Sequence, residues 1–331
     1  MAKRVQKKKV TLQDIAEATG YSKNTVSLAM KGSRRLPKDT ISSIQKKAKQ
    51  LGYKPNLIAR NLTTGKSGLI GVYASTLHDS VRTQIANGLV TELRSSQYSP
   101  ILGLGQDHSG SWYTSPWVKT LELLNVDAMV IVREFVTKMP EWLLGKPTIL
   151  VGCQPNDLLE CDYVALDRYE AANLGIDYLI EHGHKKILVC ADKESYFADG
   201  CKKRISERGA VEILPPFKSA TIENGLPELL EFVLENKGEF SAIIFGDSPV
   251  AVEFLTMLSD AGVSVPEELA IISYDYLPYA KHLRVPLTTI SQPIEEIVSE
   301  AVTLTNSRLE KPDGKFIHKQ LKHKIIPGKS V

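Results

Sequence analysis

The side chains best placed to do chemistry lie in residues 22–30, which read Ser-Lys-Asn-Thr-Val-Ser-Leu-Ala-Met. Ser22 can cap a helix here, because its hydroxyl can accept a hydrogen bond from a backbone N–H of the first turn. The apolar residues share one face at helical spacing: Val26, Ala29 and Met30. The other faces carry donors and one leucine: Lys23, Asn24, Ser27 and Leu28. Such a helix fits a DNA major groove, although the same pattern alone also describes an ordinary surface helix.

Basic residues surround this helix. Residues 1–66 contain 16 Lys and Arg against Asp14, Glu17 and Asp39, a net charge of +13, whereas residues 67–331 carry a net charge of −10. A basic segment of this density favours a polyanionic partner such as nucleic acid. The first fifth of the chain is therefore predicted to bind DNA, and the remainder is not.

The elements that would position the helix are themselves short and helical. Thr11 and Asp14 form a pair typical of a capping box at the start of one helix, which Gly20 ends. Another helix is predicted to begin at Pro37 and to end at Gly52. Two helices joined by a tight turn and braced by a third are typical of a helix-turn-helix unit. We expect a basic arm at 1–10, an all-α headpiece at 11–54, and a hinge helix with its linker at 55–67.

From residue 68 the pattern changes to apolar strands alternating with amphipathic helices. The predicted strands are 69–73, 98–104, 128–132, 148–151, 186–190, 242–245 and 269–273. The predicted helices lie around 81–96, 116–124, 170–182, 198–208, 225–236 and 248–261. Strands that alternate with helices indicate doubly wound parallel sheets, and this number indicates two such α/β units. A chain of 331 residues is also too long for a single ordinary core.

Residues 11–65 resemble the headpiece and hinge of the lactose/galactose-repressor (LacI/GalR) family of bacterial transcription regulators. The matching strings are Leu12-Gln-Asp-Ile-Ala-Glu-Ala-Thr-Gly20, Ser22-Lys-Asn-Thr-Val-Ser27, Gly52-Tyr53-Lys-Pro55-Asn56 and Ala59-Arg60-Asn-Leu62. Looser matches follow at 164–167, 179–187, 261–275 and 286–292. The resemblance implies a core at 68–331 similar to periplasmic sugar-binding proteins. Its lobe one would be at about 68–165 and 290–318, and its lobe two at about 166–289 and 319–331.

The resemblance implies which residues meet the operator. Lys23, Asn24 and Leu28 would face base edges, and Leu62 would be the hinge leucine that wedges into the minor groove. The other residues implied at the DNA are Thr11, Ser22, Thr25, Ser27, Arg35, Thr40, Tyr53, Asn56 and Arg60. Many relatives carry arginine at the position of Leu28, so the operator half-site is predicted to differ from the family's common one. Pro37 replaces a frequent capping residue, which predicts the loss of one phosphate contact.

The resemblance also implies an effector in the cleft between the lobes, where loops after parallel strands supply the ligands. The matching positions are Ser75, Phe197, Phe217, Asp247, Asp275 and Gln292. Asp275 is the strongest of them, since a carboxylate at a strand end can accept two sugar hydroxyls, with a structural strand-end cap as the alternative. For the two phenylalanines, core packing and stacking on a ligand are equal alternatives.

Three departures concern this cleft. Phe197-Ala-Asp-Gly200 replaces the family's Arg-x-x-Gly, Gly152 stands where some relatives offer an acid, and Gly246 replaces an asparagine. These losses of polar groups predict a different ligand, a less hydroxylated one, or none.

Motifs of enzymes and metalloproteins are incomplete. Residues 65–67 resemble the end of a P-loop, but the first glycine of that motif would fall at residue 60, which is Arg60. Gly103-x-Gly105 resembles the start of a dinucleotide fingerprint, but the third glycine of that motif is missing. The four cysteines form no CxxC pair and are interpreted as reduced, half-buried thiols, with a disulfide or zinc as the lesser alternative. His182 and His184 are too closely spaced to offer two ligands from one helix face. We expect no catalytic residues, no metal and no cofactor.

The sequence therefore predicts a cytoplasmic, nucleoid-associated bacterial regulator of the repressor type, without a membrane span. Its partners would be double-stranded operator DNA, a small-molecule effector such as a sugar, and a second copy of the chain in a homodimer, with higher oligomers left open. The alternatives are a sugar- or solute-binding protein without a DNA role, a sugar-processing enzyme, and a regulator that lacks an effector.

Overall fold

The computed structural model describes residues 10–30, 32–33, 35–53, 66–74, 79–96, 98–105, 115–133, 139–155, 160–193, 195–213 and 225–331. It divides into two compact units, residues 1–67 and 68–331. Some residues to which the sequence analysis gave roles lie outside the described ones: Asn56, Arg60, Leu62, Ser75 and Phe217, with most of the basic arm. Among the described residues, no helix is both long and apolar enough to cross a membrane.

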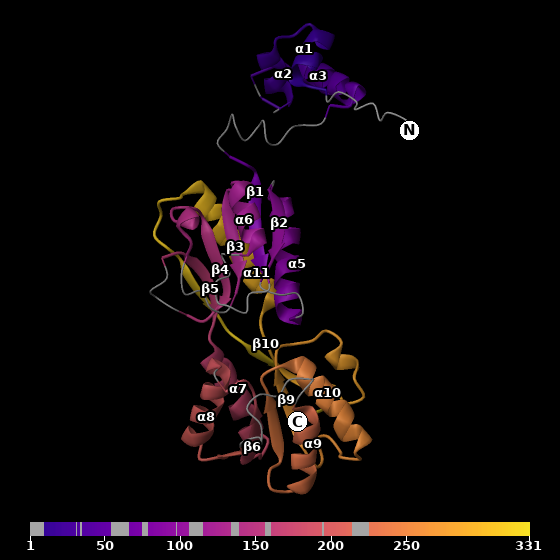
Figure 1. Cartoon of the computed structure of the whole chain (residues 1–331), viewed down its shortest axis with the longest axis vertical. Helices are drawn as coiled ribbons and strands as arrows, with labels where there is room; N and C mark the ends of the chain where they lie inside the picture. The colour runs from indigo at the N-terminus through magenta and orange to yellow at the C-terminus, as the bar shows by residue number, and fades with distance from the viewer. Residues whose placement is uncertain are drawn as a thin grey trace. The chain divides into compact units, whose positions relative to one another are not determined.

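The described residues of the first unit form a headpiece of three helices, α1 (Leu12–Thr19), α2 (Lys23–Met30) and α3 (Lys38–Leu51) (Figure 1). Thr11 and Asp14 form the predicted capping box at the start of α1. The backbone of Gly20 and Gly52 is left-handed where α1 and α3 end, which glycine adopts without steric cost. The prediction that α3 begins at Pro37 is wrong by one residue, because Pro37 has an extended ψ of 142° and precedes the first helical residue. The headpiece has a small core of buried residues from all three helices: Ile15, Ala16, Val26, Ala29, Ile44 and Ala48.

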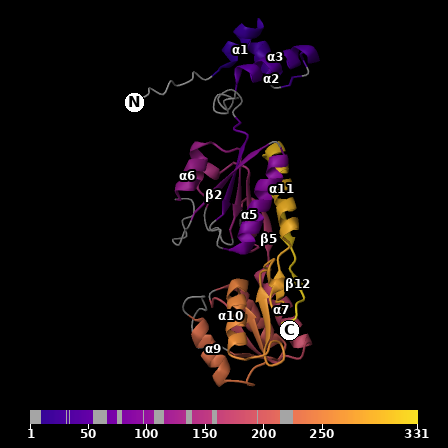
Figure 2. The same cartoon turned by 90° about the vertical axis from the view of Figure 1, so that its right-hand side faces the viewer.

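Lobe one of the second unit is built on a parallel six-stranded sheet with the order β11-β5-β4-β3-β1-β2. Its strands are β1 (Leu69–Ala74), β2 (Ser99–Leu104), β3 (Ala128–Val132), β4 (Thr148–Cys153), β5 (Asp162–Leu166) and β11 (His318–Leu321). Its helices are α5 (Ser80–Ser95), α6 (Pro116–Leu123), the short η2 (Glu141–Leu143) and α11 (Ile294–Glu310). Helices α5 and α11 cover one face and α6 covers the other, so both faces are buried (Figure 2).

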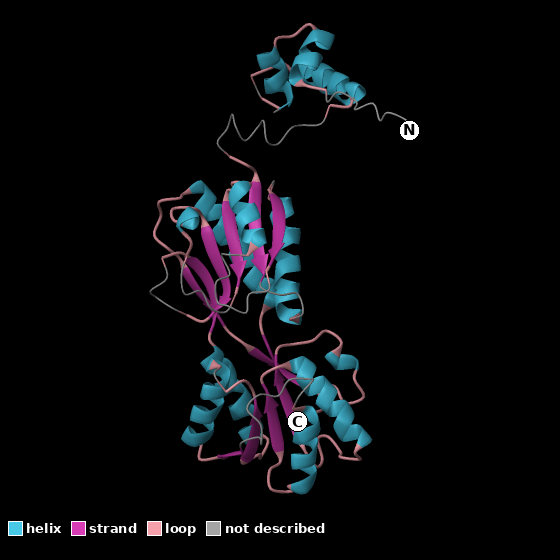
Figure 3. Cartoon of the chain, in the orientation of Figure 1, coloured by secondary structure: helices cyan, strands magenta, loops and turns pink. Residues whose placement is uncertain are grey.

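Lobe two repeats this plan with the strand order β12-β10-β9-β8-β6-β7. Its strands are β6 (Lys186–Cys190), β7 (Val211–Ile213), β8 (Ala242–Phe245), β9 (Ala270–Tyr274), β10 (Thr288–Ser291) and the antiparallel β12 (Lys324–Ile326). Its helices are α7 (Arg168–Glu181), α8 (Tyr196–Glu207), α9 (Leu226–Glu235), α10 (Ser248–Asp260) and the short η3 (Ala280–His282). The pair α7 and α8 and the pair α9 and α10 lie on opposite faces of the sheet (Figures 1 and 3).

The chain passes between the lobes three times. The first crossing lies between β5 and α7, the second between β10 and α11, and the third between β11 and β12. Strand β10 keeps the chain in lobe two until Ser291, and β11 keeps it in lobe one until Leu321. The second and third crossings therefore lie a few residues later than the positions at 290 and 318 expected from the sequence. The predicted fold class, a helical headpiece followed by a two-lobed α/β core, is confirmed.

Candidate nucleic-acid interface and interlobe cavity

Helix α2 is fixed at both ends by hydrogen bonds. The Oγ of Ser22 accepts the backbone N–H of Thr25 at 3.1 Å, which is the predicted cap. At the other end the side-chain amide of Gln45, on α3, donates to the carbonyl oxygen of Ala29 at 3.1 Å. Val26 and Ala29 are buried beneath the helix. The helix is thus anchored to the headpiece by these contacts, and the side chains of Lys23 and Asn24 are exposed to solvent.

Helix α2 carries the three residues predicted to face base edges, Lys23, Asn24 and Leu28, and two more that are predicted to contact DNA, Thr25 and Ser27. Lys23 and Asn24 are exposed, whereas Thr25, Ser27 and Leu28 are half-buried. The lysine and asparagine offer hydrogen-bond donors, and the asparagine also offers an acceptor, which is the chemistry that base edges in a major groove require. Leu28 contributes an apolar contact only. The structure brings all five together on one helix.

The remaining described candidates for DNA contact lie around this helix in the headpiece. Arg35 is exposed, and Thr40 and Tyr53 are half-buried. Burial raises the pKa of Tyr53, so its hydroxyl stays protonated and can donate a hydrogen bond. Thr11 already donates its hydroxyl hydrogen to Asp14 at 2.8 Å as part of the capping box. A phosphate contact by Thr11 would have to compete with that bond.

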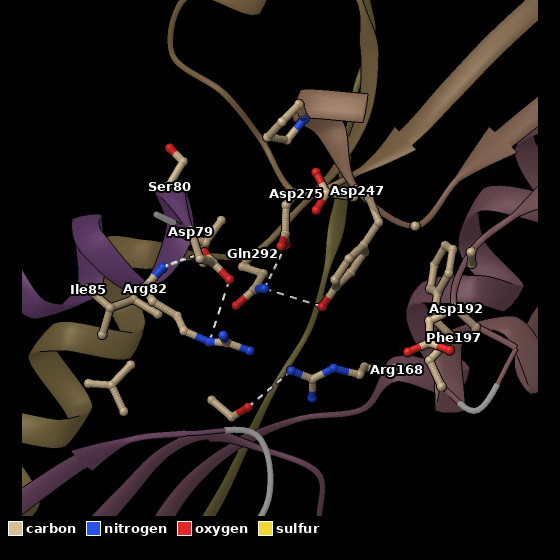
Figure 4. A pocket seen from close by; sticks show the side chains of 18 of the residues that line it. Asp79, Ser80, Arg82, Ile85, Arg168, Asp192, Phe197, Asp247, Asp275 and Gln292 are labelled. Atoms are coloured by element: carbon tan, nitrogen blue, oxygen red, sulfur yellow. Dashed lines mark hydrogen bonds and ion pairs between the residues drawn. The ribbon is translucent and has the colours of Figure 1, made fainter. Parts of the chain in front are cut away.

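A cavity of about 550 Å³ lies between the two lobes of the core. Lobe one supplies the start of α5 and the residues at the ends of β3 and β4, and lobe two supplies the loops that follow β6, β8 and β9. Its wall thus combines the carboxyl ends of strands from both sheets, which is where open α/β sheets bind ligands. Figure 4 shows charged side chains directed into it from both lobes.

The cavity lining includes all four predicted cleft residues that the structure describes: Phe197, Asp247, Asp275 and Gln292. It also includes charged residues that sequence reasoning missed: Asp79, Arg82, Arg133, Arg168 and Asp192. Arg133 and Asp192 follow β3 and β6 closely, so the strand-end rule that identified Asp275 could have found them. Asp79 and Arg168 stand at the starts of helices, where helix capping explains such residues equally well.

Asp275 is held in an unusual backbone conformation. Its φ is 75°, a left-handed value that costs energy in a residue other than glycine. The hydroxyl of Ser248 supports it by donating to the carbonyl oxygen of Asp275, and it also lies 2.9 Å from that of Tyr274. The amide nitrogen of Gln292 donates to Asp275 Oδ1 at 2.7 Å. The orientation of the Asp275 carboxylate is therefore set by hydrogen bonds from neighbouring residues rather than by the strand β9 that it follows.

The surroundings of Asp275 and Asp247 in the cavity favour the neutral, protonated form of their carboxyl groups. Burial, and then the negative charge of Asp79, raise the pKa of Asp275 to about 7, although the Gln292 hydrogen bond and the charge of Arg168 act in the opposite direction. Burial and Asp79 also raise the pKa of Asp247. Three carboxyl groups from two lobes thus repel one another here, and a ligand that donates hydrogen bonds would relieve that repulsion.

Basic groups face the same space. Arg168 is buried at the start of α7 and donates to the carbonyl oxygen of Gly152 at 3.3 Å, which links lobe two to lobe one. The Nε of Arg82 lies 3.5 Å from the Asp79 carboxylate at the start of α5. The cavity therefore presents both acceptors and donors, a lining suited to a polar ligand.

Phe197 mainly packs in the core of lobe two. Its side chain is almost fully buried, and its ring lies 4.9 Å from that of Tyr274 in a tilted arrangement. It also contributes to the lining of the cavity. Of the two roles left open by the sequence, packing accounts for most of its contacts.

The cysteines and histidines singled out by the sequence have structural environments. All four cysteines are buried and free, so the prediction of half-buried thiols is wrong. Burial raises the pKa of Cys153 and Cys161 to about 12, which keeps both thiols protonated and unreactive. His182 ends α7 with its Nδ1 2.7 Å from the carbonyl oxygen of Tyr178. Within the part of the chain that the structure describes, no cluster of three His, Cys, Asp or Glu residues could hold a metal ion.

Both units match known protein families. Residues 11–56 match the bacterial regulatory proteins of the lacI family, and residues 176–331 match the periplasmic binding protein-like domain. Catabolite control protein A of Priestia megaterium is 25% identical over 332 residues, which cover 96% of this chain and 97% of that protein.

Solved structures share the complete architecture. A lac repressor dimer bound to operator and the anti-inducer ONPF superposes with a TM-score of 0.83 at 19% identity, covering 98% of this chain and 99% of that one. A complex of the transcriptional regulator CelR with cellobiose gives a TM-score of 0.65 at 20% identity, covering 98% of this chain and 100% of that one. At these identities the likeness is one of fold.

A helix-turn-helix headpiece followed by a two-lobed periplasmic-binding-protein-like core defines a class of DNA-binding transcription regulators. This chain carries the lacI-family DNA-binding domain at residues 11–56, as its headpiece motifs predicted, together with a periplasmic-binding-protein-like domain.

Proposed function

We propose that the chain is a dimeric regulator of the repressor type, which binds a palindromic operator and is controlled by a small molecule in the interlobe cavity. The observation that carries this proposal is α2. It is a capped helix, braced by two others, that exposes Lys23 and Asn24 in a segment with a net charge of +13. Each headpiece would place α2 in one major-groove half-site, and two-fold symmetry of the dimer would make the operator palindromic. The protein would act in the bacterial cytoplasm by binding rather than by catalysis.

The base preference of the half-site follows from the side chains on α2. Asn24 suits adenine, because its amide can donate to and accept from the edge of that base. Leu28 can only make an apolar contact, for which the methyl group of thymine is the matching partner. We therefore propose an operator that is richer in A·T pairs at these positions than one read by an arginine.

Operator binding is tested by titrating duplex DNA with salt. A headpiece that neutralises several phosphates should lose affinity steeply as salt rises, with a slope of about −0.9 per phosphate on logarithmic axes. Asn24→Ala should cost about 1–3 kcal/mol in discrimination between operator and random DNA. Gln13→Ala, at an exposed position on α1, is the matched control and should change little. Weak binding with no salt dependence would favour the solute-binding alternative.

The hinge proposal concerns Leu62, which lies outside the described residues and rests on the family resemblance alone. An apolar wedge unstacks a base step and bends the duplex, so Leu62→Ala should reduce operator affinity while the core stays folded. Unchanged affinity would remove the wedge from the mechanism.

The effector proposal rests on the charged cavity. Bound cellobiose in the CelR complex supports a sugar-sized ligand, and the cavity volume of about 550 Å³ accommodates one. A ligand present at about 100 times its Kd should stabilise the core by about 2.7 kcal/mol, which a thermal-shift screen of sugars, amino sugars and nucleotides would detect. Hits that vanish in Asp275→Asn would locate the ligand. A screen in which no compound raises the melting temperature would support the alternative of a regulator without an effector.

A further inference from the structure

Two carboxyl groups in the wall of the interlobe cavity have no cationic partner among the described residues. Asp247 and Asp275 both line the cavity from lobe two, and neither forms an ion pair with a described residue. Asp79, which lines the cavity from lobe one, differs from them, because the Nε of Arg82 lies 3.5 Å from its carboxylate. A carboxylate that leaves water costs free energy unless a positive charge or hydrogen bonds compensate it. A ligand could supply that compensation at Asp247 and Asp275.

The protein uses only one of the two side-chain oxygens of Asp275. Its Oδ1 accepts from the side-chain amide of Gln292 at 2.7 Å, and within the described part of the chain nothing donates to Oδ2. The charge of Asp247 also acts on Asp275, and the two side chains lie near each other in the cavity wall (Figure 4). The pKa of Asp275 is raised because burial and the charge of Asp79 outweigh the Gln292 bond. Its carboxylate is thus under-compensated in the chain alone.

Gln292 provides another unused acceptor beside Asp275. Its amide nitrogen must be the atom that faces Asp275, since a carboxylate can only accept hydrogen bonds. That nitrogen also lies 3.3 Å from the hydroxyl of Tyr274, so each of its two hydrogens has an acceptor in the protein. The amide oxygen remains, and no described residue donates to it. Gln292 is 7% exposed and its side chain lines the cavity, so this buried oxygen is available to a ligand (Figure 4).

The arginines of the cavity are engaged away from these acceptors. Arg82 is paired with Asp79 at the start of α5, and Arg168 donates to a carbonyl oxygen of lobe one at 3.3 Å. The charge of Arg168 lowers the pKa of Asp275, but the two form no ion pair. Two further charged residues line the cavity without acting on the pKa of Asp275: Arg133 and Asp192. The described protein therefore leaves a place for one positive charge beside Asp275.

We propose that the cavity takes an amino sugar, whose protonated primary amine lies among Asp275, Asp247 and the amide oxygen of Gln292. An ammonium group donates three hydrogen bonds, and these residues offer three acceptors. The arginine donors elsewhere in the lining suit the hydroxyl oxygens of the same ligand. Within the described residues no cluster of three His, Cys, Asp or Glu could hold a metal ion, which favours an organic cation. The inference rests on the proposed function in one respect, namely that the cavity takes a small molecule.

The amine is tested with matched sugars on the full-length protein. The amines are D-glucosamine, 3-amino-3-deoxy-D-glucose and 6-amino-6-deoxy-D-glucose, and each is compared with D-glucose and with its own N-acetyl derivative. The acetyl group keeps the nitrogen and removes its positive charge. Each amine is added as its hydrochloride at pH 7, against sodium chloride at the same concentration. Calorimetry should show at least one amine that binds about 10-fold more tightly than both of its neutral partners.

Two conservative variants locate the amine. Asp275→Asn removes the charge, and asparagine tolerates the left-handed backbone at this position. The variant should lose the preference for the amine, while its affinity for a neutral sugar changes little. Asp247→Asn precedes α10, where asparagine is also a good cap, and should reduce the preference in the same direction. Asp260→Asn, at the exposed last residue of α10, is the matched control and should leave the preference intact.

The outcomes separate this inference from the proposed effector. A neutral sugar that binds as tightly as its amine, or a preference that survives in both Asp275→Asn and Asp247→Asn, would overturn the amine and leave a small-molecule effector standing. Calcium chloride alone that raises the melting temperature as much as the amines would assign the position to an inorganic cation and overturn the inference as well. No response to any compound would overturn the effector and the amine together, while operator binding is measured separately by the salt titration.

Discussion

The headpiece and the interlobe cavity place their candidate functional side chains by opposite means. The headpiece gathers five candidate DNA-binding residues on one eight-residue helix, held by a local cap and a neighbouring helix. The cavity assembles its charged residues from segments as distant as Asp79 and Gln292. The headpiece site therefore depends on a small local unit, whereas the cavity depends on the whole two-lobed core. Disrupting one should leave the other working.

The largest effect is expected from Ile44→Asp. Ile44 is completely buried in the headpiece core, and a carboxylate there would be unpaired. The substitution should cost about 4 kcal/mol or more, which a unit of this size cannot tolerate. Operator affinity should fall by more than about 100-fold, measured by fluorescence anisotropy. The melting temperature of the core should not move, and a matching loss of core stability would show that the two units are not independent.

The next largest effect is expected from Asp162→Ala in lobe one. The Nε and Nη2 of Arg308 each donate to one carboxylate oxygen of Asp162 at 2.7 Å. Both side chains are almost completely buried. Removing one partner of a buried pair costs about 3–5 kcal/mol, because the remaining charge is left without compensation. Urea unfolding of the core should report this loss.

Asp177→Ala provides the control for that measurement. Asp177 forms an ion pair with Arg204, and both side chains are about a quarter exposed. Losing this pair should lower the free energy of unfolding by about 1 kcal/mol or less. Similar losses in the two variants would contradict the distinction between buried and surface pairs.

A smaller effect of opposite sign is expected from Asp275→Asn. The pKa of Asp275 is raised to about 7 in the folded protein, so between about pH 4 and 7 the folded state binds more protons than the unfolded chain. The free energy of unfolding therefore falls as pH rises through this range, and the asparagine removes that loss. The variant should be more stable by about 2 kcal/mol at pH 8, after discounting for partial exposure, and equal to the unmodified protein near pH 4.

Urea unfolding of the core at several pH values measures this difference. The difference in unfolding free energy between Asp275→Asn and the unmodified protein should be larger at pH 8 than at pH 4. An equal difference at both pH values would show that ionisation of Asp275 does not destabilise the folded protein.

The smallest effect is expected from Ser22→Ala. It removes the hydroxyl that accepts the Thr25 backbone N–H at the start of α2, which costs about 1 kcal/mol. Headpiece stability should fall by this amount and operator affinity should fall only slightly. Thermal unfolding of the headpiece, followed by circular dichroism, is the measurement. A loss as large as that from Ile44→Asp would mean that the cap fixes the whole headpiece rather than one helix end.

The sequence was most informative where the cause of structure is local. The capping box at Thr11 and the glycines at 20 and 52 set helix ends within a few residues, and the structure has them as predicted. Helix α11 was missed, because Pro293 gives it no side-chain cap and its register depends on packing against α5. The strand-end rule found Asp247 and Asp275 but missed Asp79 and Arg168. Their place in the cavity depends on how the two lobes meet, which no local pattern encodes.

The central claim, that α2 reads a symmetric operator through Lys23, Asn24 and Leu28, is tested most directly by selecting bound sequences from a random DNA pool. The account predicts two inverted half-sites, and predicts that Leu28→Arg selects guanine at one additional position in each half-site. Enrichment of no sequence, or selection of the same sequence by both proteins, would contradict it.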